Sequence, residues 1–118
     1  MNYPLEKMNA TRIMVIDDQE IVRCGLRHIL EQEKDMEVVG DFASVEEAFS
    51  RLKMLSPDVI LMDADMSGAS GLEATWHLKR NGLNYEGDVI LLAESMNQRS
   101  QALASGAAAC LLKDVTRE

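Results

Sequence analysis

The hydrophobic pattern of the chain is dominated by short apolar runs that end in carboxylates. One run, at residues 13–16, precedes Asp17 and Asp18. Another, at residues 59–62, precedes Asp63. Uninterrupted apolar runs of this length are typical of strands that are buried on both faces of a sheet. Similar runs lie at residues 38–39 and 89–92, and a weaker one lies at residues 109–112. The pattern therefore predicts strands at each of these places.

Segments with helical periodicity lie between the runs. From Val45 to Leu52, apolar residues recur at i, i+3, i+4 and i+7, which predicts a helix with one buried face. Ser44 and Glu47 have the spacing of a capping box and mark its start. The helix before it should bury Val22, Leu26, Ile29 and Leu30. Two later helices are expected at residues 71–80 and 96–105, with Gly82 and Gly106 as their stops.

This alternation of strands and helices predicts an α/β fold. Parallel strands need crossover connections, so the expected product is a doubly wound parallel sheet with helices on both faces. With 118 residues, 47% of them hydrophobic, the chain can form one compact core. We expect a leader at residues 1–10 and one domain at residues 11–118. Residues 114–118 are too few for the helix that should follow the last strand, which indicates a fragment of a longer protein.

Charge and composition exclude some classes of function. The formal net charge of −8 argues against a surface that neutralises nucleic-acid phosphates, because such surfaces need clustered Lys and Arg. No apolar stretch approaches the roughly 18 residues of a membrane span, and the leader has no signal-peptide core. We therefore expect a cytoplasmic protein without membrane contacts. Cys24 and Cys110 lack metal-site spacing and are expected to be reduced, buried thiols.

The carboxylates that follow the strands predict a metal site. In open α/β sheets, ligands bind beyond the carboxyl ends of the strands. Asp17 and Asp18 follow the first strand and Asp63 follows the third, and neighbouring strands lie about 4.8 Å apart. Carboxylates this close repel one another unless a cation is bound, and a small set of hard oxygen ligands suits Mg²⁺. Lys113, at the end of the fifth strand, could reach the same pocket.

Taken together and in this order, these residues resemble the receiver domains of two-component response regulators. The resemblance covers Arg12 to Asp114. It rests on four motifs: Asp17-Asp18-Gln19-Glu20, the run of residues 57–63, Gly71 eight residues beyond Asp63, and the segment Leu111-Leu112-Lys113-Asp114. The last motif resembles the corresponding segment of receivers that are joined to helix-turn-helix output domains of the LuxR type.

The resemblance implies a flavodoxin-like sheet with the strand order 2-1-3-4-5. It implies that Asp63 accepts a phosphoryl group from a sensor histidine kinase, and that the domain catalyses only its own modification. Asp17, Asp18 and Asp63 would bind Mg²⁺ together with the backbone carbonyl of Asp65, and Lys113 would contact the phosphoryl group. A homodimer is expected. Contact with DNA would come only through an output domain that lies outside this chain.

The chain departs from the receiver pattern at the residues that usually respond to phosphorylation. Receivers usually carry Thr or Ser at the end of the fourth strand, where this chain has Leu92 and Ala93. Cys110 stands where a Tyr or Phe usually precedes the lysine by three residues. Ser95 either replaces the missing hydroxyl or caps the following helix, and capping is favoured. Phosphorylation is still expected, but the usual conformational response is not.

Two other classes of function stay open. A pseudo-receiver would keep the fold and act as a dimerisation module without a phosphorylation cycle. The absence of the usual switch residues from this chain favours the pseudo-receiver. The presence of the charged residues Asp17, Asp18, Asp63 and Lys113 opposes it. A phosphohydrolase of the haloacid dehalogenase type is the other class, because Asp63 and Asp65 form a D-x-D motif. In that class the motif follows the first strand and the second Asp acts as an acid.

Overall fold

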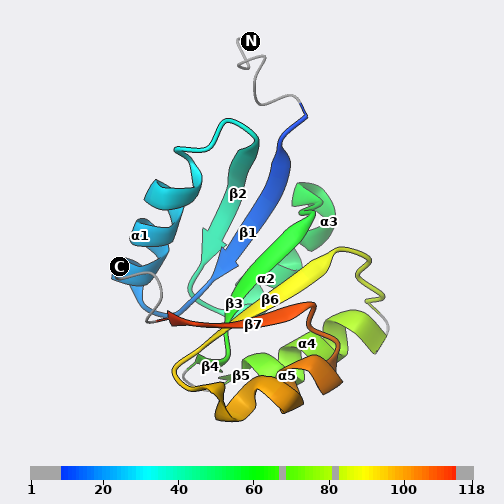
Figure 1. Cartoon of the computed structure of the whole chain (residues 1–118). Helices are drawn as coiled ribbons and strands as arrows, with labels where there is room; N and C mark the ends of the chain where they lie inside the picture. Colours follow the sequence, from blue (N-terminus) through cyan, green and yellow to red (C-terminus); the bar gives the residue numbers. More distant parts are fainter. Residues whose placement is uncertain (1–8, 67–68, 81–82, 114–118) are drawn as a thin grey trace.

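A five-stranded parallel sheet forms the centre of the molecule (Figure 1). The computed structural model describes residues 9–66, 69–80 and 83–113, so the predicted leader and the residues after Lys113 fall largely outside it. The strands of the sheet are β1 (Thr11–Ile16), β2 (Met36–Phe42), β3 (Val59–Asp63), β6 (Asp88–Ala93) and β7 (Ala109–Leu112). Their order is β2-β1-β3-β6-β7, which is the predicted order 2-1-3-4-5 for the five parallel strands. The predicted α/β fold is therefore confirmed.

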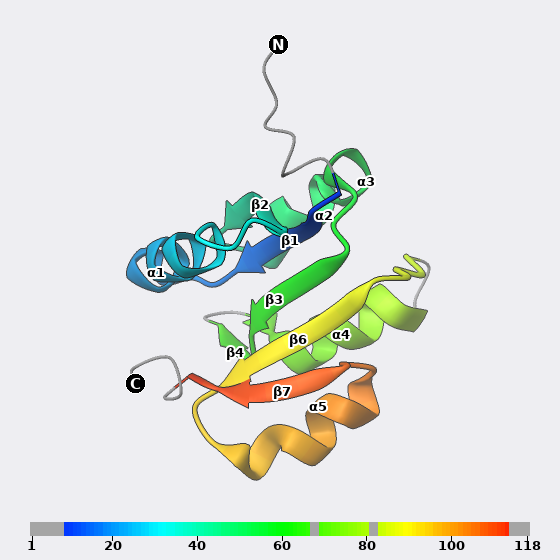
Figure 2. The ribbon, with the colours of Figure 1, turned by 45° about the horizontal axis from the view of Figure 1, so that its top comes forward.

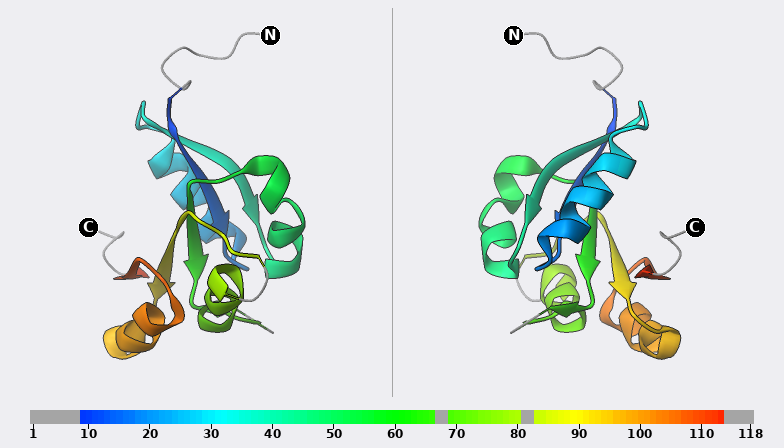
Figure 3. Two further views of the ribbon diagram at one scale, coloured as in Figure 1. Left: turned by 90° about the vertical axis from the view of Figure 1, so that its right-hand side faces the viewer. Right: turned by 90° about the vertical axis from the view of Figure 1, so that its left-hand side faces the viewer.

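Helices cover both faces of the sheet, as expected for a doubly wound fold. They are α1 (Glu20–Leu30), α2 (Val45–Ser50), α3 (Leu52–Leu55), α4 (Gly71–Arg80), the 3-10 helix η2 (Met96–Gln98) and α5 (Arg99–Ser105). Figure 3 shows α1 and α2 on opposite sides of β1 and β2. Figure 2 shows α4 and α5 along β6 and β7, at the other end of the sheet from α1. Among the described residues, no helix is long and apolar enough to cross a membrane.

The core has two parts, one on each face of the sheet. Met14, Ile60 and Leu91 point to the face that α2, α4 and α5 cover, and they are fully buried. Ile13 and Val15 point to the other face, where α1 packs on them. Alternate residues of β1 and β3 therefore enter different parts of the core, which explains why these two strands are apolar without interruption.

Helix α1 buries less of its surface than its sequence predicts. Val22, Leu26 and Leu30 are half-buried, and the last two pack against the sheet. Ile29 was also expected on this face but is 49% exposed, because consecutive helical residues project about 100° apart. Cys24 is likewise exposed, not buried as expected. Leu26 and Leu30 therefore make the apolar contact of α1 with the strands.

The predicted helix from Val45 to Leu52 is interrupted. Arg51, with φ −105° and ψ 2°, lies between α2 and α3. Ser44 caps α2 as expected, since its Oγ accepts a hydrogen bond from the backbone N–H of Glu47 at 3.2 Å. The interruption turns the chain so that the short α3 leads back toward β3.

The later helices agree more closely with the prediction. Helix α4 spans the predicted residues 71–80, whereas its predicted stop, Gly82, lies outside the described residues. The predicted helix at residues 96–105 begins as the 3-10 turn η2 and continues as α5. Gly106 ends it with φ 113°, a left-handed conformation that glycine adopts without strain. A two-stranded antiparallel pair, β4 (Asp65–Met66) and β5 (Ala69–Ser70), connects β3 to α4 and was not predicted.

Candidate functional site

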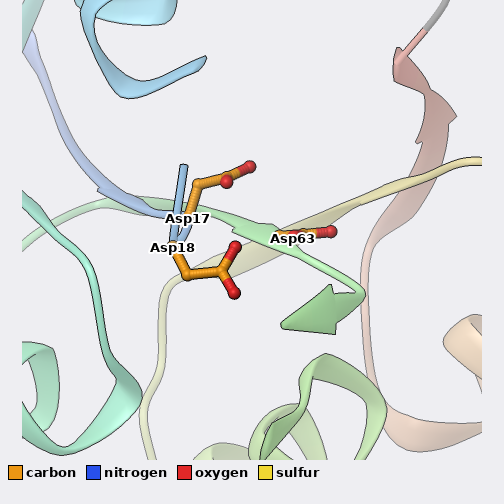
Figure 4. A group of neighbouring side chains, drawn as sticks. All are labelled: Asp17, Asp18 and Asp63. Carbon is orange, nitrogen blue, oxygen red and sulfur yellow. The ribbon is translucent and has the colours of Figure 1, made fainter. Parts of the chain in front are cut away.

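Three carboxylates meet at the carboxyl edge of the sheet (Figure 4). Ile16 of β1 pairs with Met62 of β3, so the residues that follow them lie side by side. Asp17, Asp18 and Asp63 each offer one carboxylate oxygen, and these oxygens lie within 4.8 Å of one another. The convergence predicted from the sequence is confirmed.

Lys113 joins the cluster from the end of β7. Its ammonium Nζ lies 3.3 Å from Asp17 Oδ2 and 3.2 Å from Asp63 Oδ1. Asp17 and Asp63 are 0% and 3% exposed, so both of these ion pairs are shielded from water. Lys113 follows β7 and reaches across the edge of the sheet to strands β1 and β3. The predicted proximity of Lys113 to the carboxylates is therefore observed.

Local turns orient two of the carboxylates. Asp17 Oδ1 accepts a hydrogen bond from the backbone N–H of Gln19 at 2.9 Å, and Asp63 Oδ1 accepts one from Asp65 N–H at 3.1 Å. Both are bonds from residue i+2 to the side chain of residue i, the geometry of an Asx turn. The sequence favours such turns directly after a strand because Asp supplies the acceptor locally. Each carboxylate is thereby directed back across the edge of the sheet.

Burial and mutual repulsion shape the ionisation of the cluster. Burial raises the pKa of Asp63, and the neighbouring charge of Asp17 raises it further; the Asp65 N–H and Lys113 oppose these effects without overcoming them. Burial lowers the pKa of Lys113, but attraction to Asp63 and Asp17 outweighs burial and raises it above its usual value. Lys113 is therefore a stable ammonium, whereas the ionised form of Asp63 is disfavoured.

The cluster fits a small divalent cation. Among the described residues, Asp17 and Asp63 share the one ammonium of Lys113, which balances only part of the negative charge of the three carboxylates. Asp17 Oδ2 is buried and accepts no hydrogen bond from the described residues, which leaves it only the ion pair with Lys113. Oxygens on opposite sides of a Mg²⁺ ion lie about 4.2 Å apart, so ligand oxygens within 4.8 Å of one another need only small movements to bind it. The donor set and its spacing are consistent with a receiver metal site.

The side chain of Asp65 points away from this cluster. It is exposed, and its Oδ1 accepts a hydrogen bond from Gln98 Nε2 at 2.9 Å. The predicted role of its backbone carbonyl as a metal ligand stays a prediction. The bond to Gln98 joins the segment after β3 to the turn η2, and nothing in the sequence indicated this pair, which is separated by 33 residues.

The atypical switch residues are buried in the strands β6 and β7. Leu92 and Ala93 end β6 with 5% and 0% exposure, and Cys110 of β7 is 5% exposed. Ser95 Oγ accepts a hydrogen bond from the N–H of Asn97 at 3.0 Å, so the expected capping role of Ser95 is confirmed. The positions that usually carry a hydroxyl and an aromatic ring are occupied by side chains that pack in the core.

Gly71 allows α4 to begin against the site. Its N–H donates to the carbonyl of Ala64 at 2.9 Å. A Cβ atom at this position would overlap the carbonyl oxygen of Asp63 and would lie 2.7 Å from Ala64 Cα. Only glycine leaves room for the backbone that carries Asp63, which gives a physical reason for the glycine eight residues after it.

Ionised Asp63 should reduce stability when no cation is bound. Because the pKa of Asp63 is raised above the usual 3.8, the folded chain binds a proton on this carboxylate more tightly than the unfolded chain does. Its contribution to the free energy of unfolding is therefore fully present below pH 3.8 and is lost as the pH rises through the folded pKa. In EDTA at neutral pH, Asp63→Asn should be more stable than the unaltered chain in urea denaturation.

Two further comparisons test this linkage. The advantage of Asp63→Asn should shrink as the pH falls to the usual pKa of an aspartate, where the unaltered side chain also becomes neutral. Adding Mg²⁺ should stabilise the unaltered chain more than the variant. An advantage that is independent of pH would show that packing, not ionisation, causes it.

Known proteins resemble this chain over nearly its whole length. The family model described as response regulator receiver domain matches residues 13–118. The response regulator GacA of Pseudomonas viridiflava is 35% identical over 102 residues, which cover 86% of this chain and 48% of GacA. The chain thus spans about half the length of the curated relatives it matches.

Two solved structures show the same fold. A two-component response regulator of the LuxR family from Aurantimonas sp. SI85-9A1 is 28% identical with a TM-score of 0.79, and the match covers 88% of this chain and 74% of that one. RcsB from Salmonella enterica serovar Typhimurium, bound to the promoter P1flhDC in the presence of phosphomimetic BeF3−, is 27% identical with a TM-score of 0.77. That match covers 89% of this chain and 53% of RcsB.

Proposed function

Because this chain belongs to the response regulator receiver domain family, we propose that it accepts a phosphoryl group on Asp63. The observation that carries the proposal is that the Asp63 carboxylate lies 3.2 Å from the ammonium of Lys113 and meets the carboxylates of Asp17 and Asp18. A carboxylate held between a cation site and a fixed ammonium can react with a phosphoryl donor whose charge both groups stabilise.

The reaction uses the Asp63 side chain as the nucleophile. One of its carboxylate oxygens attacks the phosphorus of a phosphohistidine, the phosphorus–nitrogen bond breaks, and the imidazole leaves with a proton from solvent. The product is an aspartyl phosphate. Lys113 contacts a phosphoryl oxygen and balances part of the added charge, since its raised pKa keeps it protonated. The domain modifies itself and acts on no other substrate.

Mg²⁺ is the proposed cofactor. The carboxylates of Asp17, Asp18 and Asp63 and the backbone carbonyl of Asp65 would hold it. When bound, it supplies positive charge next to the phosphoryl oxygens. The excess negative charge of the cluster matches the charge of a divalent cation, and Asp17 Oδ2 has no competing hydrogen bond from the described residues.

The proposed partners follow from the relatives. The phosphoryl donor is a sensor histidine kinase. The output is transcriptional, through a DNA-binding domain outside this chain, because GacA is a response regulator about twice as long and RcsB is described as bound to a promoter. The net charge of −8 fits this division, since this segment would contribute little to binding DNA. A homodimer and a cytoplasmic location complete the proposal.

A pseudo-receiver is the second candidate, and a specific observation favours it. Leu92, Ala93 and Cys110 are buried at the positions of the usual switch residues, so they provide no hydroxyl or ring that could move toward a phosphate.

The haloacid dehalogenase interpretation has no such observation in its favour. Its second acid would be Asp65, but this side chain is exposed and bonds to Gln98, and the motif follows β3 instead of the first strand.

Incubation with acetyl phosphate separates the two candidates. We expect intact-mass spectrometry to show one phosphoryl addition in the presence of Mg²⁺ and none in EDTA. A folded chain that binds Mg²⁺ but forms no adduct would favour the pseudo-receiver. An adduct that forms equally well in EDTA would contradict the proposed role of the cation.

A further inference from the structure

An ion-pair network joins α1 to β2 beside the carboxylate cluster. Arg23 Nε donates to Asp41 Oδ1 at 3.1 Å, and Arg27 donates to Asp41 Oδ2 from Nε at 3.0 Å and from Nη2 at 2.7 Å. The side chains of Arg23 and Asp41 are 16% and 27% exposed, so water screens this pair less than an ion pair on the surface. Asp41 thus holds two arginines of the same helix in defined positions.

The two arginines differ in their remaining contacts. Arg23 Nη1 donates to the backbone carbonyl of Asp17 at 2.8 Å. The remaining contact of Arg27 is with Glu31, one turn further along α1 at 3.2 Å. Within the part of the chain that the structure describes, Arg23 and not Arg27 therefore connects the network to a residue of the carboxylate cluster.

The backbone of Asp17 is held at its N–H by β2 and at its carbonyl by Arg23 of α1. Its N–H donates to the carbonyl of Phe42, the last residue of β2, at 3.0 Å. Its carbonyl accepts from Arg23, which is fixed by Asp41, the residue before Phe42. The carbonyl of Asp17 belongs to the peptide that joins it to Asp18. Rotation of this peptide would change the direction in which the Asp18 carboxylate projects.

We propose that Arg23, held by Asp41, is a positioning residue for the cation site. It fixes the peptide between Asp17 and Asp18 so that both carboxylates stay directed at Asp63. Such fixing is needed because three like charges within 4.8 Å repel one another and would otherwise turn apart before a cation binds. The proposal rests on the proposed function, since it assigns Arg23 a role in forming the Mg²⁺ site.

When Arg23 is replaced by a neutral residue, the loss of its charge and the loss of its positioning contact should change the Mg²⁺ affinity in opposite directions. Loss of a positive charge next to an acidic site should strengthen Mg²⁺ binding, whereas loss of the contact with Asp17 should weaken it. Groups that orient metal ligands typically contribute about 10- to 100-fold to metal affinity, so the weakening should prevail. The sign of the change therefore separates the two effects.

Mg²⁺ titration followed by two-dimensional NMR tests the proposal, with Arg27→Gln as the matched control. Both Arg23→Gln and Arg27→Gln lose one positive charge and one partner of Asp41, but only Arg23→Gln loses the contact with Asp17. We expect Arg23→Gln to bind Mg²⁺ about tenfold more weakly or worse. Arg27→Gln should bind as the unaltered chain does, or slightly more tightly. Urea denaturation should show similar stability losses for both variants.

A second readout separates positioning from a general loss of structure. In the acetyl phosphate reaction, Arg23→Gln should need a higher Mg²⁺ concentration for half-maximal phosphorylation but should approach the unaltered rate at saturating Mg²⁺. If Arg23→Gln does not fold, Arg23→Lys keeps the charge without the forked contact and should show the same shift.

The outcomes also separate this proposal from the proposed function. Equal Mg²⁺ affinities of Arg23→Gln and Arg27→Gln would overturn the positioning role and leave the phosphoacceptor intact. If the unaltered chain binds Mg²⁺ and Arg23→Gln binds it more tightly, the charge effect prevails and the proposal is also overturned. Failure of the unaltered chain to bind Mg²⁺ would overturn both.

Discussion

Asp63→Asn should abolish phosphoryl incorporation from acetyl phosphate, while Asp65→Asn should retain it. A carboxamide is too poor a nucleophile to form the acyl phosphate, so the rate should fall by several orders of magnitude. Asp65 lies two residues further on, is exposed, and bonds to Gln98 through an oxygen that asparagine also provides. Its backbone carbonyl is unchanged by the substitution. Intact-mass spectrometry of both variants with Mg²⁺ makes the comparison.

The pair of variants also tests the D-x-D alternative. In a haloacid dehalogenase-type reaction the second aspartate acts as an acid, so Asp65→Asn should then be almost as damaging as Asp63→Asn. Equal losses in the two variants would contradict the receiver mechanism. An adduct on folded Asp63→Asn would show that another residue accepts the phosphoryl group.

Gly71→Ala should strongly destabilise the fold. The added Cβ would overlap the carbonyl oxygen of Asp63 and lie 2.7 Å from Ala64 Cα. Both obstacles are backbone atoms of the segment that carries the acceptor, so they cannot turn aside as a flexible side chain would. Overpacking of this kind costs about 1–3 kcal/mol, and we expect the upper end of this range in urea denaturation. Phosphorylation should also slow, because the Asp63 carbonyl must shift.

Gly25→Ala is the matched control. Gly25 lies inside α1, and a Cβ atom there would meet nothing within 4 Å. Alanine favours a helix interior over glycine by about 0.5–1 kcal/mol, so this variant should be slightly more stable than the unaltered chain. If Gly71→Ala lowers the free energy of unfolding by less than about 0.5 kcal/mol, this result would contradict the close approach of α4 to the site.

The parts of the fold that the sequence predicts correctly are those set by local pattern. The uninterrupted apolar runs identify β1 and β3 because residues of these strands pack into the core on both faces of the sheet. The bounds of α4 are correct since Gly71 and the helical periodicity both mark them. The interruption at Arg51 is not visible in the sequence, because arginine is a good helix former. The prediction that Ile29 is buried was wrong, because the periodicity indicates which face of a helix is buried but not how wide that face is.

Some contacts of the site are likewise predictable from the sequence, and others are not. Asp17, Asp18, Asp63 and Lys113 follow strands, and a parallel sheet brings the carboxyl ends of its strands together, so their meeting is predictable. The contact between Arg23 and Asp17 is not, because it depends on how α1 turns against β2. Long polar side chains have many rotamers, and no periodicity selects the one that they adopt.

The chemical identity of the acceptor tests the central claim most directly. Borohydride reduces an aspartyl phosphate to homoserine, which marks the acceptor position permanently. After reaction with acetyl phosphate and Mg²⁺, reduction and tryptic digestion, mass spectrometry of the peptide between Lys53 and Lys79 should show homoserine at position 63 and aspartate at position 65. Homoserine at another position, or none in a chain that has gained a phosphoryl group, would contradict Asp63 as the phosphoacceptor.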